Sequence, residues 1–174
     1  MKKILSVLVV GLVMGTSSVV MAQKYAYIDS EEILNSMPSY TEAQAQLEKL
    51  SIDWQKEIEA RFKAIDEMYR KYQQDAVILP EDAKVKRQNE IINAENEAKE
   101  LQKKRFGTDG DLYKKREELI KPIQDRVFTA IEEYARDRGY AFVFDKAGAL
   151  TIVYADTKYD ITDQVMAKLG VVGK

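Results

Sequence analysis

The sequence predicts an α+β protein in which a small β body carries a long, protruding antiparallel helical hairpin. Three observations support this fold class. Apolar residues recur at coiled-coil spacing in the charged region 40–138. A proline at position 80 divides that region into two arms. Short alternating apolar segments, which are typical of strands, lie before and after it.

Residues 1–22 are expected to form a signal peptide rather than part of the fold. Lys2 and Lys3 precede an apolar run, and the pattern Val20-x-Ala22 ends it, so we expect cleavage after Ala22. An uncleaved membrane anchor is the alternative, but the run is short and is broken by glycine, threonine and serine. This interpretation places the mature protein in the periplasm or outside the cell.

Residues 23–39 are expected to form the first part of the body, a short strand followed by a short helix. In the segment "KYAYI", Tyr25 and Tyr27 would face one side of a sheet. Ala26 and Ile28 would then face the other side.

The first arm begins near residue 40, where apolar and aromatic residues recur every three or four positions, about 3.5 on average. These positions are Tyr40, Ala43, Leu47, Leu50, Trp54, Ile58, Phe62, Ile65, Met68 or Tyr69, Tyr72, Ala76 and Leu79. Pro80 interrupts the pattern, and Glu81 and Asp82 suit the start of a new helix. The tip of the hairpin is therefore predicted near residues 78–82.

The return arm runs from about Asp82 to Arg138 and contains Gly107, Gly110 and Pro122. A glycine in a helix interior costs about 1 kcal/mol relative to alanine, and a proline about 3 kcal/mol. A chain reversal at residues 107–110 would leave two arms of very unequal length, so we interpret this site as a soft point within one arm. It is either a bend that makes the arm flexible or a local bulge that absorbs a register mismatch.

Residues 139–174 are expected to complete the body with a β-hairpin and a terminal helix. Gly139 would end the long helix, and two alternating segments around "DKAGA" would form the hairpin. Both faces of this hairpin are apolar, so other helices or subunits should cover them. The residues proposed for oligomerisation are Tyr25, Tyr27, Ile28, Phe142, Phe144, Ile152 and Tyr154.

The composition argues against an enzyme. The chain has no histidine and no cysteine, which removes the commonest general base, the thiol nucleophile and most zinc sites. Of 27 basic side chains, two lie in the signal segment, which leaves 25 against 29 acidic ones. This balance is unlike that of nucleic-acid binders. We expect no catalytic residue, no metal and no cofactor.

The order of these elements resembles the Skp or OmpH-like periplasmic chaperone family. The resemblance is carried by "KYAYIDSEEILNSMP", by "YAFVFDKAGALTIVYAD" with "DITDQVMAKLG", and by the charged arms between them. It implies a homotrimer whose strands form a barrel-like body, with three arms around a cavity. Such a protein would be an ATP-independent holdase that binds unfolded outer-membrane proteins and prevents their aggregation. The alternative is a structural coiled-coil spacer or scaffold of the cell envelope.

Aromatic side chains on the arms are the candidates for client binding, although residues at helical spacing also form interhelical seams. They are Trp54, Phe62, Tyr69, Tyr72, Phe106 and Tyr113. Familiar members of the family are strongly basic, whereas this chain is mildly acidic. Lysines and arginines cluster only around the glycine pair, at positions 99, 103–105 and 114–116. The resemblance therefore implies at most a weak contact with lipopolysaccharide, and no nucleic-acid partner is expected.

Overall fold

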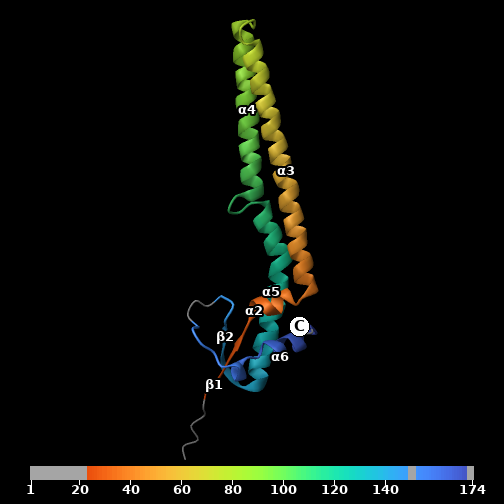
Figure 1. The fold of residues 1–174 in the computed structure, drawn as a ribbon, viewed down its shortest axis with the longest axis vertical. Coiled ribbons are helices and arrows are strands. Elements are labelled where there is room, and N and C mark those ends of the chain that lie inside the picture. Colours follow the sequence, from red (N-terminus) through yellow and green to blue (C-terminus); the bar gives the residue numbers. More distant parts are fainter. Residues whose placement is uncertain (1–22, 149–151, 172–174) are drawn as a thin grey trace, which may run out of the picture.

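In the computed structural model, which describes residues 23–148 and 152–171, a two-helix arm stands clear of a small body (Figure 1). The helices of the arm lie side by side, and two strands and two short helices gather at its base. The expected α+β class with a protruding helical hairpin is confirmed. The predicted signal peptide lies outside the described residues.

The sheet of the body consists of β1 (Lys24–Ile28) and β2 (Tyr140–Asp145), which pair in parallel. Tyr25 lies opposite Phe142, and Tyr27 lies opposite Phe144. Parallel strands need a long crossover connection. Here the whole arm is that connection, because it leaves the body after β1 and returns to it before β2.

Local sequence signals fix where the first helices begin. The carboxylate of Asp29 accepts a hydrogen bond from the backbone N–H of Glu32 at 2.9 Å, which caps α2 (Ser30–Asn35). Pro38 then occupies the first turn of α3 (Pro38–Asp75), where its missing N–H leaves no hydrogen bond unmade.

The arm combines α3 with α4 (Glu81–Phe106) and α5 (Asp111–Arg138). The chain turns between α3 and α4 at residues 76–80, and it loops out between α4 and α5 at residues 107–110 (Figure 1). A buried seam of Ile65, Ile91 and Ala98 joins α3 to α4 far from the body. Helix α5 stays helical through Pro122 and carries the arm down into the body.

The core lies in the body, where α2, the base of α3, α5 and α6 (Thr162–Leu169) pack behind the sheet. Ile33, Val165 and Met166 are its most deeply buried side chains. A short 3₁₀ helix, η1 (Thr157–Tyr159), leads into α6. The backbone N–H of Ile161 donates to the carbonyl of Tyr27 at 3.0 Å, so this segment occupies the second edge of β1.

The second strand of the expected β-hairpin is not formed in the described part of residues 150–155. Residues 152–155 have no strand conformation, and residues 150–151 lie outside the described ranges. The prediction assumed that β2 pairs with its neighbour in sequence. Instead β2 pairs with β1, and residues 160–161 take the other edge of β1. Val153 and Tyr154 consequently remain 97% and 84% exposed.

Candidate functional site

An aromatic cluster covers the outer face of the sheet. Tyr25, Phe142 and Phe144, called the aromatic face below, stack with ring centroids 5.9 to 6.5 Å apart. Alternation along β1 turns Ala26 and Ile28 to the opposite face, into the core. The three aromatic residues keep 43%, 55% and 48% of their surface exposed, so this face has no cover within the described chain.

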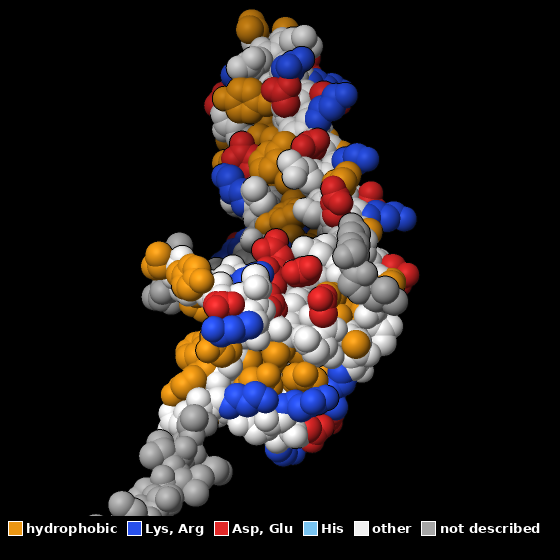
Figure 2. All heavy atoms as spheres, turned by 60° about the horizontal axis from the view of Figure 1, so that its bottom comes forward, with side chains coloured by type: hydrophobic (Ala, Val, Ile, Leu, Met, Phe, Trp, Pro, Cys, Tyr) orange, Lys and Arg blue, Asp and Glu red, His pale blue; other side chains and the backbone are white. Residues whose placement is uncertain are grey.

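A hollow of about 580 Å³ lies beside the aromatic face. It is lined by Tyr25, Tyr27 and Phe144 from the sheet and by residues 152–156 and Tyr159 from the segment after it. Figure 2 shows hydrophobic side chains gathered on the side of the body that this view brings forward. Exposed apolar areas of this kind are typical of interaction surfaces.

Two residues proposed for oligomerisation are buried within the single chain. Ile28 is 2% exposed and belongs to the core. Tyr27 is 7% exposed and lies between β2 and the segment at Asp160. Both stabilise the fold of a single chain, whereas Tyr25, Phe142, Phe144 and Tyr154 are free to meet another surface.

A polar clip of Asp29, Lys146, Asp160 and Thr162 ties the ends of the body together. The Lys146 ammonium lies 3.5 Å from Asp29 and 3.7 Å from Asp160. Burial alone would lower the pKa of Lys146, but these carboxylates outweigh it and raise the pKa above its usual value. Burial would raise the pKa of Asp160, but hydrogen bonds from the hydroxyl and N–H of Thr162 lower it.

Two of the arm aromatics pack against each other between α3 and α4. Trp54 and Phe106 meet edge to face with ring centroids 6.4 Å apart, and the Arg105 guanidinium lies 4.6 Å from the centre of the indole. Tyr72 lies in the distal seam, and its hydroxyl accepts a hydrogen bond from Gln88 at 2.7 Å. These three aromatics therefore contribute to interhelical packing, and Phe106 also keeps 38% of its surface exposed.

The other three arm aromatics are partly exposed to solvent. Phe62, Tyr69 and Tyr113 are 38%, 49% and 50% exposed. Sequence reasoning missed the most exposed apolar residues of the arm, Val77 and Ile78, at 91% and 81%. The available signal was their position, Ile78 in the predicted turn at residues 78–82 and Val77 directly before it, because a turn at the end of an arm has no partner to pack against.

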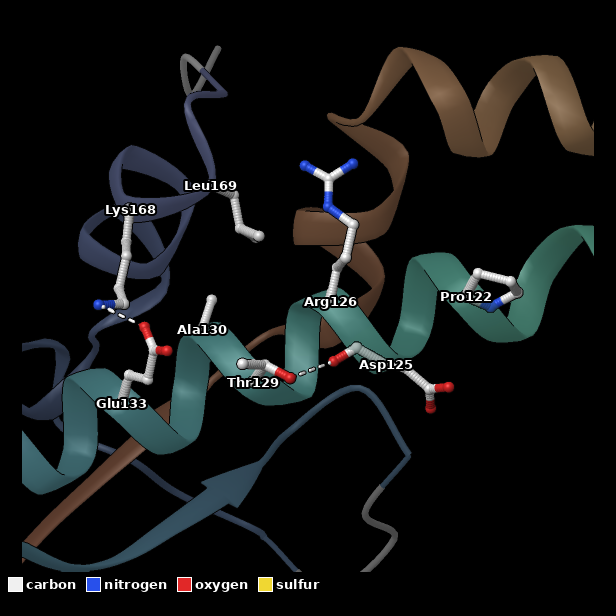
Figure 3. A pocket seen from close by; sticks show the side chains of 8 residues that line it. All are labelled: Pro122, Asp125, Arg126, Thr129, Ala130, Glu133, Lys168 and Leu169. Atoms are coloured by element: carbon white, nitrogen blue, oxygen red, sulfur yellow. Dashed lines mark hydrogen bonds and ion pairs between the residues drawn. The ribbon is translucent and has the colours of Figure 1, made fainter.

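A groove of about 620 Å³ runs between α5 and α6 in the body (Figure 3). Lys168 and Glu133 form an ion pair across it at 2.9 Å, which lowers the pKa of Glu133 and raises that of Lys168. Thr129 bonds only back to its own helix, to the carbonyl of Asp125. Among the described residues, no three His, Cys, Asp or Glu side chains are grouped so that they could hold a metal ion.

Comparison with known proteins matches this chain to one family. The sequence model of the outer membrane protein (OmpH-like) family matches residues 24–169, from the first strand to the last helix. The chain belongs to the OmpH-like family. An uncharacterised protein of Aquifex aeolicus (strain VF5) is 28% identical to this OmpH-like protein over 145 residues, which cover 83% of this chain and 85% of that protein.

A solved structure has the same fold. A crystal structure from Caulobacter crescentus CB15, described as a candidate outer membrane chaperone (OmpH-like), superposes with a TM-score of 0.68 at 15% identity. The match covers 84% of this OmpH-like chain and 83% of the other. No helix within the described ranges is both long enough and apolar enough to cross a bilayer.

Proposed function

We propose that this OmpH-like protein is an ATP-independent holdase chaperone of the periplasm. It binds unfolded outer-membrane proteins in a cavity between helical arms and prevents their aggregation. The observation that carries this proposal is an arm that stands clear of the body with Phe62, Tyr69 and Tyr113 exposed along it. Membership of the OmpH-like family and the fold shared with the Caulobacter protein support it.

The chemistry of the client suits such an arm. A precursor of an outer-membrane β-barrel is a chain of alternating apolar residues that cannot bury them in water. Several weak apolar contacts, engaged together, hold such a chain more strongly than any one contact and still allow release. A cage needs more than one arm, and we propose a homotrimer assembled through the aromatic face, whose three stacked rings lack cover in a single chain.

Suppression of aggregation tests the holdase activity directly. A denatured outer-membrane protein is diluted from urea with increasing amounts of this protein, and turbidity is recorded. We expect that the triple variant Phe62→Ala, Tyr69→Ala, Tyr113→Ala needs about threefold more protein for the same suppression, because binding is distributed over many weak contacts. Its mass by light scattering should equal that of the unmodified protein, since none of these residues lies on the aromatic face.

The matched control replaces three exposed, uncharged arm residues, with Gln55→Ala, Gln73→Ala and Gln102→Ala. It should suppress aggregation as well as the unmodified protein. Equal suppression by the aromatic variant and its control would contradict the placement of client contacts on these aromatics.

A structural spacer of the cell envelope is the second candidate. The close contacts of Arg105 with Trp54 and with two carboxylates on neighbouring helices favour a stiff arm, which suits a spacer. A spacer has one folded partner and leaves the aggregation of denatured clients unchanged. Failure of the unmodified protein to suppress aggregation would therefore favour this candidate over the holdase.

A further inference from the structure

The return arm is interrupted where α4 ends at Phe106 and α5 begins at Asp111, while α3 runs past without a break (Figure 1). Residues 107–110 form a tight loop, closed by a hydrogen bond from the N–H of Gly110 to the carbonyl of Gly107 at 2.9 Å. Because helical hydrogen bonds do not continue through this loop, side-chain contacts contribute to the alignment of α4 with α5.

Arg105 contacts all three helices at this interruption. One guanidinium nitrogen, Nη1, donates to the Asp111 carboxylate at 2.8 Å, at the start of α5. The other, Nη2, donates to the Glu57 carboxylate of α3 at 3.3 Å. The guanidinium also lies 4.6 Å from the ring centre of Trp54, so one residue of α4 bonds to α5 and packs on α3.

These contacts are more enclosed than the ion pairs on the open helix faces. The side chains of Arg105, Asp111 and Glu57 are 23%, 27% and 38% exposed, whereas both partners of the Arg136–Glu132 pair are 71% exposed. Enclosed pairs are screened less by salt and water than exposed pairs. The Nε atom of Arg105 is buried without a hydrogen-bond partner. The orientation of the guanidinium is therefore set by the hydrogen bonds of Nη1 and Nη2 and by packing.

The two glycines of the loop lie against backbone atoms at the end of α4. A methyl group at Gly107 would lie 2.4 Å from the carbonyl oxygen of Lys103, and one at Gly110 would lie 2.9 Å from that of Arg105. The glycines thus allow the loop to fold closely onto the end of α4.

We propose that Arg105, Glu57 and Asp111 form a latch that holds α4 and α5 at one angle beside α3. Arg105 is the positioning residue of this latch. With the latch closed, the distal arm keeps a constant direction relative to the body. Trp54 and Phe106 then serve the packing of the latch rather than contact with a client.

Distances measured across the interruption test the latch. Spin labels are attached to Asn93→Cys in α4 and Gln124→Cys in α5, both exposed positions in a chain without native cysteine. A rise of about 1.5 Å per residue places them roughly 45 Å apart. Labelled chains are refolded in excess unlabelled chain, so that distances within one chain dominate. We expect the distance distribution to widen about twofold in Arg105→Gln.

Matched variants separate the latch from general effects of charge and stability. Glu57→Gln and Asp111→Asn each remove one anchor and should give intermediate widening. Lys104→Gln removes the same charge from the neighbouring exposed position and should leave the width unchanged. Amide hydrogen exchange at residues 107–113 should become about tenfold faster in Arg105→Gln and stay unchanged in Lys104→Gln.

The outcomes decide the proposal in either direction. The latch is refuted if Arg105→Gln has the helix content of the unmodified protein and an equally narrow distribution of spin-label distances. A lower melting temperature of this variant would not change that conclusion. If Arg105→Gln does not fold, Glu57→Gln and Asp111→Asn decide, and unchanged widths in both refute the latch.

Discussion

Glycine serves two different purposes in this chain. Gly139 and Gly170 follow helices with φ of 70° and 74°, a left-handed conformation that a Cβ disfavours. Gly107 and Gly110 have ordinary negative φ angles, and they are glycines because backbone carbonyls lie where a side chain would be. The interruption of the arm is therefore a packed feature and not merely a weak helix segment.

A methyl group at position 107 should consequently destabilise the arm. In Gly107→Ala the new Cβ displaces the carbonyl of Lys103 or the loop, and overpacking of this kind costs about 1 to 3 kcal/mol. Thermal unfolding followed by circular dichroism should show a lower midpoint. Gly148→Ala is the control, because a Cβ at that position meets no atom within 4 Å. Equal midpoints for the two variants would contradict this account of Gly107.

At the scale of elements, the polar clip joins parts that are distant in sequence. The N–H of Asp29 donates to the Thr162 hydroxyl at 3.0 Å, which links the end of β1 to the start of α6. Lys146, just after β2, lies between the carboxylates of Asp29 and Asp160. The clip thus holds residues 160–162, and with them the start of α6, beside β1.

Loss of the clip in acid should weaken the body. The folded state lowers the pKa of Asp160 below that of an unfolded carboxyl group. The ionised Asp160 side chain therefore stabilises the fold fully at pH values above the ordinary carboxyl pKa. This stabilisation is lost as the pH falls through the lowered pKa of the folded state. We expect Asp160→Asn to reduce stability at neutral pH and to flatten the decline of the melting temperature in acid. Glu117→Gln, on an exposed face of α5, should keep the full decline. A decline as steep in Asp160→Asn as in the unmodified protein would exclude this role.

The helices could be predicted from the sequence because their signals are local. Apolar residues at steps of three and four, with Pro80 after the first arm, indicated α3 and α4, and the glycine pair coincides with the interruption between α4 and α5. The contacts of Arg105 could not be predicted. They depend on Glu57, a residue 48 positions away in sequence that is brought close only by the pairing of the arms.

The sheet was harder to predict because strand pairing is a long-range property. Alternation correctly placed strands at residues 24–28 and 140–145, but it contains no information about partners. Proximity in sequence favoured a hairpin between β2 and residues 150–155, whereas β2 pairs with β1 across the whole arm. The same alternation still explains the aromatic face, because Tyr25, Phe142 and Phe144 point to one side.

At the scale of the whole molecule, the arm and the body differ in what they bury. The main core lies among α2, α5, α6 and the sheet, while the distal arm has only a narrow seam around Ile65 and Ile91. The body nevertheless leaves its aromatic face exposed. A small sheet with one uncovered aromatic face is stabilised when copies of the chain cover it, and this would set several arms around one base.

Phe142→Glu tests this arrangement, because Phe142 stacks with both Tyr25 and Phe144 and is the most exposed of the three rings. In an assembled protein the new carboxylate would be buried without a partner, which costs several kcal/mol for each copy. Light scattering should therefore give the mass of one chain, with helix content retained. Suppression of client aggregation should fall together with the mass, because a single arm cannot enclose a client.

The control variant Tyr69→Glu places the same charge on the exposed arm and should leave the mass of the assembly unchanged. A Phe142→Glu variant with the mass of the unmodified protein would show that the copies do not assemble through this face.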